Sequence, residues 1–183
     1  MGTRHLIKVI CDGKLVMAQY GQNDGNPTGQ GEDVCRFIRD TWMYDRLKTK
    51  AEEGQLKFLS DQDLEILAEI FNREGYPESI KETLSTIYSE SHLSREQGAK
   101  VLTMAALCLY DFYTRDERDF EHDGILPCAY VHEIDVSRGT YTIYVPRTNK
   151  RMTYPVAQIQ KWSEKKAYDE MKKLEDSWED EEE

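Results

Sequence analysis

The chain lacks the features that define several classes of protein. Its 183 residues contain no apolar run near the roughly 18 residues that a membrane-spanning helix needs. The apolar run behind the first five residues is short, and no small-residue cleavage pattern follows it. We therefore expect no membrane association and no secretion. Eleven Tyr, five Phe and three Trp are enough to build a core, which excludes general disorder.

Cysteine and histidine are scarce and widely spaced. No two of the four cysteines form a Cys-x-x-Cys pair, and no two of the four histidines stand at metal-ligand spacing. We expect four reduced thiols and no bound metal or cofactor, with His122–Asp123 and His132–Asp135 as the alternative source of metal ligands. The residues concerned are Cys11, Cys35, Cys108 and Cys128, and His5, His92, His122 and His132.

The net charge of −11 disfavours a protein that coats nucleic acid, but this charge is unevenly distributed. Residues 1–59 carry a balance of +1 and residues 128–175 a balance of +3. The acidity lies in residues 60–127, with −9, and in residues 176–183, with −6. A mildly basic part of the chain is therefore available to RNA, and an acidic part to a basic protein.

Two β-hairpins are predicted at opposite ends of the chain. Residues 4–20 alternate around Asp12-Gly13, a strong signal for a tight turn. Residues 128–145 form the second hairpin, with a turn at 137–139. The first strand is apolar on both faces, which indicates that both faces are covered. Residues 21–31 hold four glycines and a proline, and we expect them to form a long loop.

The remaining chain shows the 3.6-residue period of helices. Ser94 and Gln97 suggest a capping box at the start of a buried helix that ends near Thr114. We expect five helices, over residues 32–50, 60–74, 78–90, 94–114 and 155–175. The sequence therefore predicts a single α+β domain over residues 1–175, in which the two hairpins form one antiparallel sheet covered by helices. Residues 176–183 are predicted to be a disordered acidic tail.

The first hairpin and its loop also hold the candidate functional residues. Cleavage of RNA without a metal needs a base, an acid and a cation that stabilises the phosphorane. We assign candidate catalytic roles to Arg4, His5, Lys8, Tyr20 and Asp24, and candidate RNA-binding roles to Lys14, Gln22 and Asn23. Strand alternation places Arg4 and Lys8 on one face and His5 on the other, so a regular strand cannot bring the three together. A structural sheet edge and loop is the alternative interpretation.

Two other functions stay open. An N-terminal-nucleophile hydrolase begins with a comparable hairpin, but it needs Thr, Ser or Cys as its first residue, and here Met1-Gly2 precede Thr3. The acidic residues 60–127 could instead block a nucleic-acid site or bind a basic protein without catalysis.

The first 40 residues resemble a family of phage, prophage and bacterial proteins. The shared pattern is Met1-Gly2-Thr3-Arg4, the Asp12-Gly13 turn, and Ala-Gln-Tyr-Gly-Gln-x-Asp-Gly-x-Pro-x-Gly-Gln-Gly over residues 18–31. Asn23 and Asn26 stand where Trp and Tyr are common, which puts an aromatic stacking role of this loop in doubt.

Within this set, size, acidity and the hairpin are similar to type II-A anti-CRISPR proteins that truncate the single-guide RNA of Cas9. The resemblance implies a Cas9-dependent endoribonuclease in the cytoplasm of a bacterial host, with the Cas9–single-guide RNA complex as its partner. Shortening the guide disables Cas9, because the guide must pair with its target. We therefore predict an inhibitor that truncates guide RNA through its N-terminal hairpin, with a non-enzymatic blocking inhibitor as the first alternative.

Overall fold

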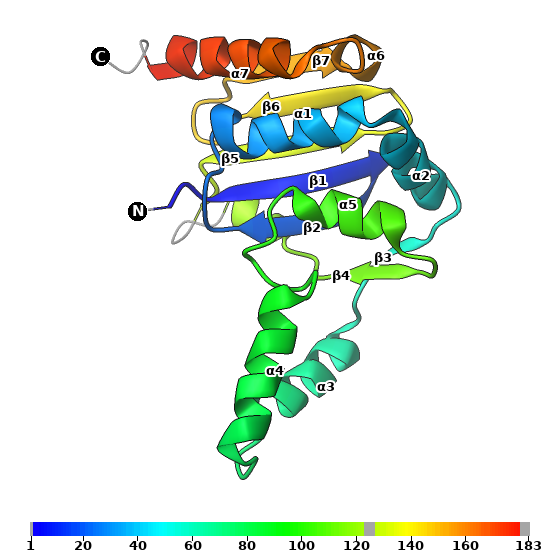
Figure 1. The fold of residues 1–183 in the computed structure, drawn as a ribbon, viewed down its shortest axis with the longest axis vertical. Helices are drawn as coiled ribbons and strands as arrows, with labels where there is room; N and C mark the ends of the chain where they lie inside the picture. The colour runs from blue at the N-terminus through cyan, green and yellow to red at the C-terminus, as the bar shows by residue number, and fades with distance from the viewer. Residues whose placement is uncertain (1, 123–126, 180–183) are drawn as a thin grey trace.

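The structure is a computed structural model that describes residues 2–122 and 127–179, and it confirms the α+β class. A five-stranded sheet lies at its centre, and helices pack on this sheet (Figure 1). The strands are β1 His5–Cys11, β2 Lys14–Gly21, β3 Leu56–Phe58, β4 Phe112–Thr114, β5 Tyr130–Asp135, β6 Thr140–Tyr144 and β7 Arg151–Pro155. The helices are α1 Glu32–Arg39, α2 Thr41–Glu52, α3 Asp61–Asn72, α4 Glu78–Glu90, α5 Lys100–Leu107, α6 Val156–Ile159 and α7 Glu164–Glu179.

Both predicted hairpins are present. β1 and β2 pair antiparallel around Asp12 and Gly13, whose φ angles of 50° and 73° are those of a two-residue hairpin turn. Ser137, in the turn of the second hairpin, accepts a hydrogen bond from the Asp12 backbone N–H at 2.7 Å. The two turns therefore lie side by side at one end of the sheet.

The way in which the hairpins join differs from the prediction. The strand order is β2-β1-β5-β6-β7, and β1 pairs with β5 in parallel, from His5 opposite Tyr130 to Ile10 opposite Asp135. The expected all-antiparallel sheet is therefore wrong at its centre. Parallel neighbours need a long crossover connection, which α1–α5 supply here. β7 adds a fifth strand that the sequence pattern did not indicate.

Both faces of the sheet are covered, as the apolar pattern of the first strand predicted. Ile7 and Val9 are fully buried under the helical layer of α1, α2, α5 and α7 (Figure 1). Leu6, on the opposite face, belongs to a second and smaller cluster with Tyr20 and Val131. Phe120 packs against this second cluster.

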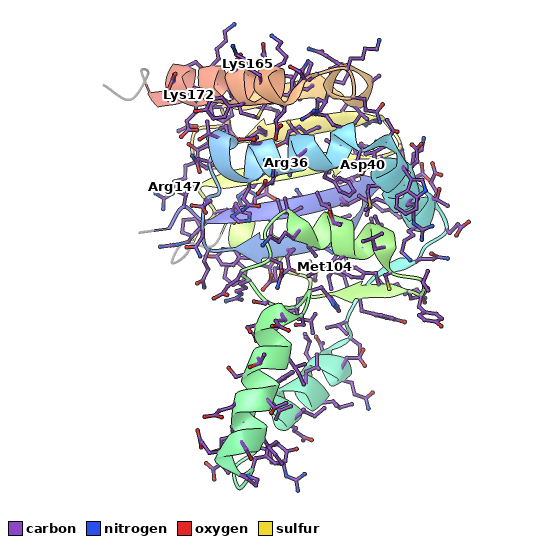
Figure 2. The ribbon with its side chains drawn as sticks, in the orientation of Figure 1. Arg36, Asp40, Met104, Arg147, Lys165 and Lys172 are labelled. Atoms are coloured by element: carbon purple, nitrogen blue, oxygen red, sulfur yellow. The ribbon has the colours of Figure 1, made fainter. Side chains whose placement is uncertain are left out.

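Two expected helices are each divided. Between α1 and α2, Asp40 leaves the helical conformation with ψ of 91°, and its carboxylate accepts a hydrogen bond from the Met43 backbone N–H (Figure 2). Asp40 is thus the N-cap of α2.

At the other end of the chain, α6 and α7 replace one helix. α7 extends to Glu179, so residues 176–179 are helical and not disordered, while residues 180–183 lie outside the described residues.

The predicted helix over 94–114 and the capping box at Ser94 are wrong. The helix α5 spans only Lys100–Leu107, and the chain then turns into β4, which pairs with β3. The buried ammonium group of Lys50 donates hydrogen bonds to the carbonyls of Cys108 and Tyr110, at 3.0 and 2.6 Å. These contacts stabilise the end of α5, and no local sequence pattern predicts them.

The helices α3 and α4 form an arm, which we define as residues 61–90. Ser60 and Asp63 make a capping box at its start, with hydrogen bonds in both directions. Figure 1 shows the arm extending away from the sheet and its helical layer. Phe71 of α3 and Tyr88 of α4 meet edge to face, with ring centroids 5.2 Å apart.

Candidate functional site

The first hairpin distributes its candidate catalytic residues over two faces of the sheet. His5 is on the face covered by the helices, because it alternates with Leu6. Lys8 lies on the opposite face, where its ammonium group contacts Glu121 and Glu133. The structure therefore does not bring His5 and Lys8 together, as the strand period already indicated.

The imidazole of His5 is enclosed. The residue is 2% exposed, and neither ring nitrogen has a hydrogen-bond partner among the described residues. Gly21 lies opposite His5 in the hairpin, and a Cβ at Gly21 would stand 2.2 Å from the ring. Burial, and then the neighbouring His132, lower the pKa of His5 from 6.5 to about 3, which the nearby backbone of Thr3 and Asn23 only partly offsets.

His132 holds the loop after the first hairpin onto the sheet. Its Nε2 lies 2.8 Å from the Gly25 carbonyl oxygen, and its Nδ1 lies 2.9 Å from the Tyr141 hydroxyl. A carbonyl only accepts, so Nε2 carries the proton and Nδ1 accepts from the hydroxyl. Burial lowers the pKa of His132 to about 4, so the ring stays neutral and structural near pH 7.

Lys8 is surrounded by acceptors. Its Nζ lies 3.1 Å from Glu121, from Glu133 and from the Tyr144 hydroxyl. The same hydroxyl donates to Glu121 at 2.6 Å. Burial raises the pKa of Glu121, but the hydrogen bonds from Tyr144 and Lys8 outweigh this effect and lower it. The two carboxylates more than neutralise Lys8, which makes it a poor ligand for phosphate.

Tyr20 and the three candidate RNA-binding residues lie in different places. Tyr20 is buried and packs against Phe120, with ring centroids 4.4 Å apart. Lys14 is exposed beside the turn of the first hairpin. Gln22 and Asn23 are exposed at the other end, at least eight residues or roughly 26 Å of strand away.

Asp24 is exposed in the same loop as Gln22 and Asn23 and has a positive φ of 54°. Its carbonyl accepts a hydrogen bond from the Gln30 backbone N–H at 2.7 Å. Asp24 thus closes a compact loop, which ends in a π-helical turn at Pro27–Gly31 instead of staying irregular as expected. Gln30 in turn accepts from the backbone N–H of Ala99 at 2.6 Å. These contacts give much of the 18–31 pattern a structural role.

Arg4 lines a different site, which we call the cationic cavity. This cavity has a volume of about 450 Å³ and lies where β1 and β5 begin and β6 ends. Because β1 and β5 are parallel, their first residues lie at the same end of the sheet. Antiparallel pairing of β6 brings the loop after Tyr144 to that end too. The side chains that matter for chemistry are Arg4, Tyr130, Arg147, Lys150 and Trp178.

The described lining of the cationic cavity is positively charged. It contains two arginines and a lysine and no acidic side chain. Within residues 2–122 and 127–179, Arg4 and Arg147 make no ion pair. Arg147 is exposed at the end of the sheet (Figure 2). Lys150 donates to the Trp178 carbonyl at 2.8 Å, which fixes its stem against α7.

Two aromatic rings form part of the same lining. Tyr130 and Trp178 are stacked, with an interplanar angle of 14° and centroids 6.2 Å apart. Both side chains are half-buried. Flat rings beside arginines offer two kinds of contact, one for planar bases and one for phosphate groups.

The sequence interpretation included Arg4 but missed the other four residues of the cationic cavity. Trp178 fell within the segment predicted to be disordered, although its spacing of four from Leu174 continues the apolar face of α7. Arg147 and Lys150 gave only a slight basic excess in residues 128–175. The missing information was the parallel pairing of β1 with β5.

The described residues offer little support for metal or thiol chemistry. They contain no group of three His, Cys, Asp or Glu side chains that could hold a metal ion. The four cysteines form no disulfide, and burial raises the pKa of Cys128, at the edge of the cationic cavity, to about 12. This thiol is therefore a poor nucleophile. None of the described helices is both long and apolar enough to cross a membrane.

Comparison of the chain with family models, with curated proteins and with solved structures finds no match. The resemblance of the first 40 residues to the phage, prophage and bacterial family, and the anti-CRISPR function that it implies, therefore stay predictions.

Proposed function

We propose that the chain binds single-stranded RNA in the cationic cavity, without cleaving it there. Arg4 and Arg147 contact phosphate groups, and the stacked rings of Tyr130 and Trp178 receive a base. The observation that carries this proposal is a cavity of about 450 Å³ with three cations and no acidic side chain in its described lining, in a chain of net charge −11.

The residue types match what single-stranded RNA offers. Its bases are unstacked and accessible, so proteins bind them on aromatic side chains and hold the backbone with basic ones. Arginine suits phosphate because its planar guanidinium donates two parallel hydrogen bonds. Double-stranded nucleic acid is less suitable, because the acidic arm and the overall charge oppose contact over a long surface.

Two observations favour binding over cleavage. The imidazole of His5 is 2% exposed and points into the covered face of the sheet. Lys8 lies between two carboxylates on the other face. A general acid or base must reach the proton that it transfers, and neither group is placed to do so beside Arg4.

The resemblance supplies the class of RNA, which on this proposal is the guide RNA of a Cas9-type effector. A protein that holds an exposed segment of guide RNA prevents its pairing with target DNA. Inhibition would then need no shortening of the guide, which corresponds to the non-enzymatic alternative but uses a basic surface instead of an acidic one.

The test is fluorescence anisotropy with a short labelled single-stranded RNA, over a series of salt concentrations. Replacing Arg4 and Arg147 together with Ala should weaken binding and reduce the slope of log K against log salt by about 1.4, two phosphate contacts at about 0.7 each. The matched control is Lys165→Ala with Lys172→Ala, which removes two positive charges from the exposed surface of α7 (Figure 2).

Equal salt slopes for the cavity variant and the α7 control would contradict the proposal. A denaturing gel of guide RNA incubated with Cas9 and the protein separates binding from truncation. Intact guide RNA together with binding supports the proposal. A shortened guide would support the predicted truncation instead, and would require a catalytic group other than the enclosed His5.

A further inference from the structure

The arm has apolar side chains that the rest of the chain leaves uncovered. No residue of α4 is buried, and every described side chain of α3 is half-buried or exposed. Ile66, Ile70, Ile80 and Ile87 are between 40% and 54% exposed. Scattered exposed apolar residues are ordinary, but several on two adjacent helices typically mark an interaction site.

A groove lies between the arm and the body of the molecule. Its volume is about 770 Å³. Apolar side chains from both helices line it, together with Phe120 of the body and several charged side chains. The wall residues are Leu64, Leu67 and Phe71 of α3, with Leu84 and Tyr88 of α4.

The arm around this groove is strongly acidic. Residues 61–90 hold eight acidic and two basic side chains, a net charge of −6 over 30 residues. Asp61 lines the groove, and Glu65 lies one helical turn further along α3. The groove's own lining holds three acidic and three basic side chains, so the acidic border is made by the exposed carboxylates of the arm around it. Apolar walls beside such a border are complementary to a helix that has an apolar face and basic flanks.

We propose that this groove binds a basic amphipathic helix of a partner protein. Apolar side chains of the partner at positions i, i+3 or i+4, and i+7 enter between α3 and α4, and its Lys or Arg residues contact the acidic border. This assignment rests on the arm alone and does not depend on RNA binding in the cationic cavity.

The cations in the groove do not oppose this assignment, because they have partners. Lys81 lies 3.6 Å from Glu78, and the Arg95 guanidinium lies 3.0 Å from the buried Glu117. Arg115 lies over the ring of Tyr88, 5.7 Å from its centroid. Its Nε is buried without a hydrogen-bond partner among the described residues.

A second copy of the chain fits the groove less well. Pairing two arms would bring two segments of charge −6 together, and like charges at close range oppose association. Nucleic acid is opposed by the same charge. The basic helix is the occupant that satisfies both the apolar walls and the acidic border.

The test uses a synthetic peptide of about 14 residues, roughly four helical turns, with leucines along one face and lysines elsewhere. Binding to the full chain is measured by fluorescence anisotropy at low salt. We expect the peptide to bind at least tenfold more tightly than two comparison peptides. One has glutamates in place of the lysines, and the other has serines in place of the leucines.

Variants of the chain locate the site. Asp61→Lys with Glu65→Lys should weaken peptide binding about tenfold. The matched control Asp45→Lys with Asp169→Lys reverses two exposed charges on the body and should change binding less than twofold. Leu84→Lys should weaken binding as well, and circular dichroism is used to check that this variant folds. The Asp61 and Glu65 changes lie on the surface, so the test does not depend on Leu84.

Three results would overturn the proposal. The first is equal binding of the lysine and glutamate peptides. The second is equal weakening by the arm variant and the body control. The third is a concentration-dependent dimer, seen by analytical ultracentrifugation, that Leu84→Lys abolishes, because the groove would then be covered by a second copy.

Discussion

Two neutral histidines buried under the helical layer should make the protein sensitive to mild acid. Burial lowers the pKa of His5 from 6.5 to about 3 and that of His132 from 6.5 to about 4. In the unfolded chain both rings regain ordinary values, so below pH 6.5 the unfolded state binds more protons than the folded state. Stability is therefore complete above pH 6.5 and is lost as the pH falls toward the folded values.

The magnitude follows from these values. Between pH 8 and pH 5 each histidine should remove about 2 kcal/mol from the free energy of unfolding, and the two together about 4 kcal/mol. This is a large part of a typical total of about 5–15 kcal/mol. Half-buried His92, whose pKa burial also lowers, acts in the same direction. Hydrogen-bonded Glu121, whose pKa lies below 4.5, loses its contribution only in more acidic solution.

The assay is urea denaturation of the wild-type chain and of His5→Leu at several pH values between 8 and 5. The variant should lose about 2 kcal/mol less than the wild type over this range. Ile7→Leu, on the same strand and face, alters packing without removing a titrating group, and it should shift the stability curve without changing its shape. If His5→Leu retains the full wild-type pH dependence, the reasoning from burial is wrong.

Two further substitutions test other parts of the fold. Lys50→Met removes the buried ammonium group that donates to Gln55 and to the carbonyls of Cys108 and Tyr110. It should lower the free energy of unfolding by about 2 kcal/mol in urea denaturation, and an unchanged midpoint would contradict the role of Lys50 at the end of α5. Gly21→Ala places a Cβ 2.2 Å from the His5 ring and should cost about 1–3 kcal/mol. The cost should shrink in a His5→Ala background, and equal costs in both backgrounds would show that the two residues do not interact.

Local patterns predicted the elements of this fold better than their connections. Asp12-Gly13 identified the first hairpin, because few residues other than Gly, Asn and Asp accept the positive φ angles of that turn. The helical period over 61–90 identified α3 and α4. The division at Asp40 and the early end of α5 were missed, since Asp40 caps within a continuous apolar period and Lys50 acts from 58 residues away.

The sequence likewise predicted only part of the candidate site. Strand alternation alone separated His5 from Lys8, and the structure agrees. It could not show that His5 is enclosed, because the ring is covered by Gly21 and by the loop that His132 holds in place. Nor could it join Arg4 to Arg147, because residues that are 143 positions apart meet only through the pairing of strands.

The sequence by itself determined the α+β class, both hairpins, the positions of most helices and the concentration of acidic charge in the middle of the chain. Those features depend on residues that are close together in the sequence, so their turn preferences, periodicity and charge can be read directly along the chain. Tertiary structure alone decided that β1 lies parallel to β5, that Arg4 faces a cationic cavity and that the acidic arm keeps an apolar groove. These depend on which distant segments pack together, and side-chain patterns along one strand or helix do not specify that choice.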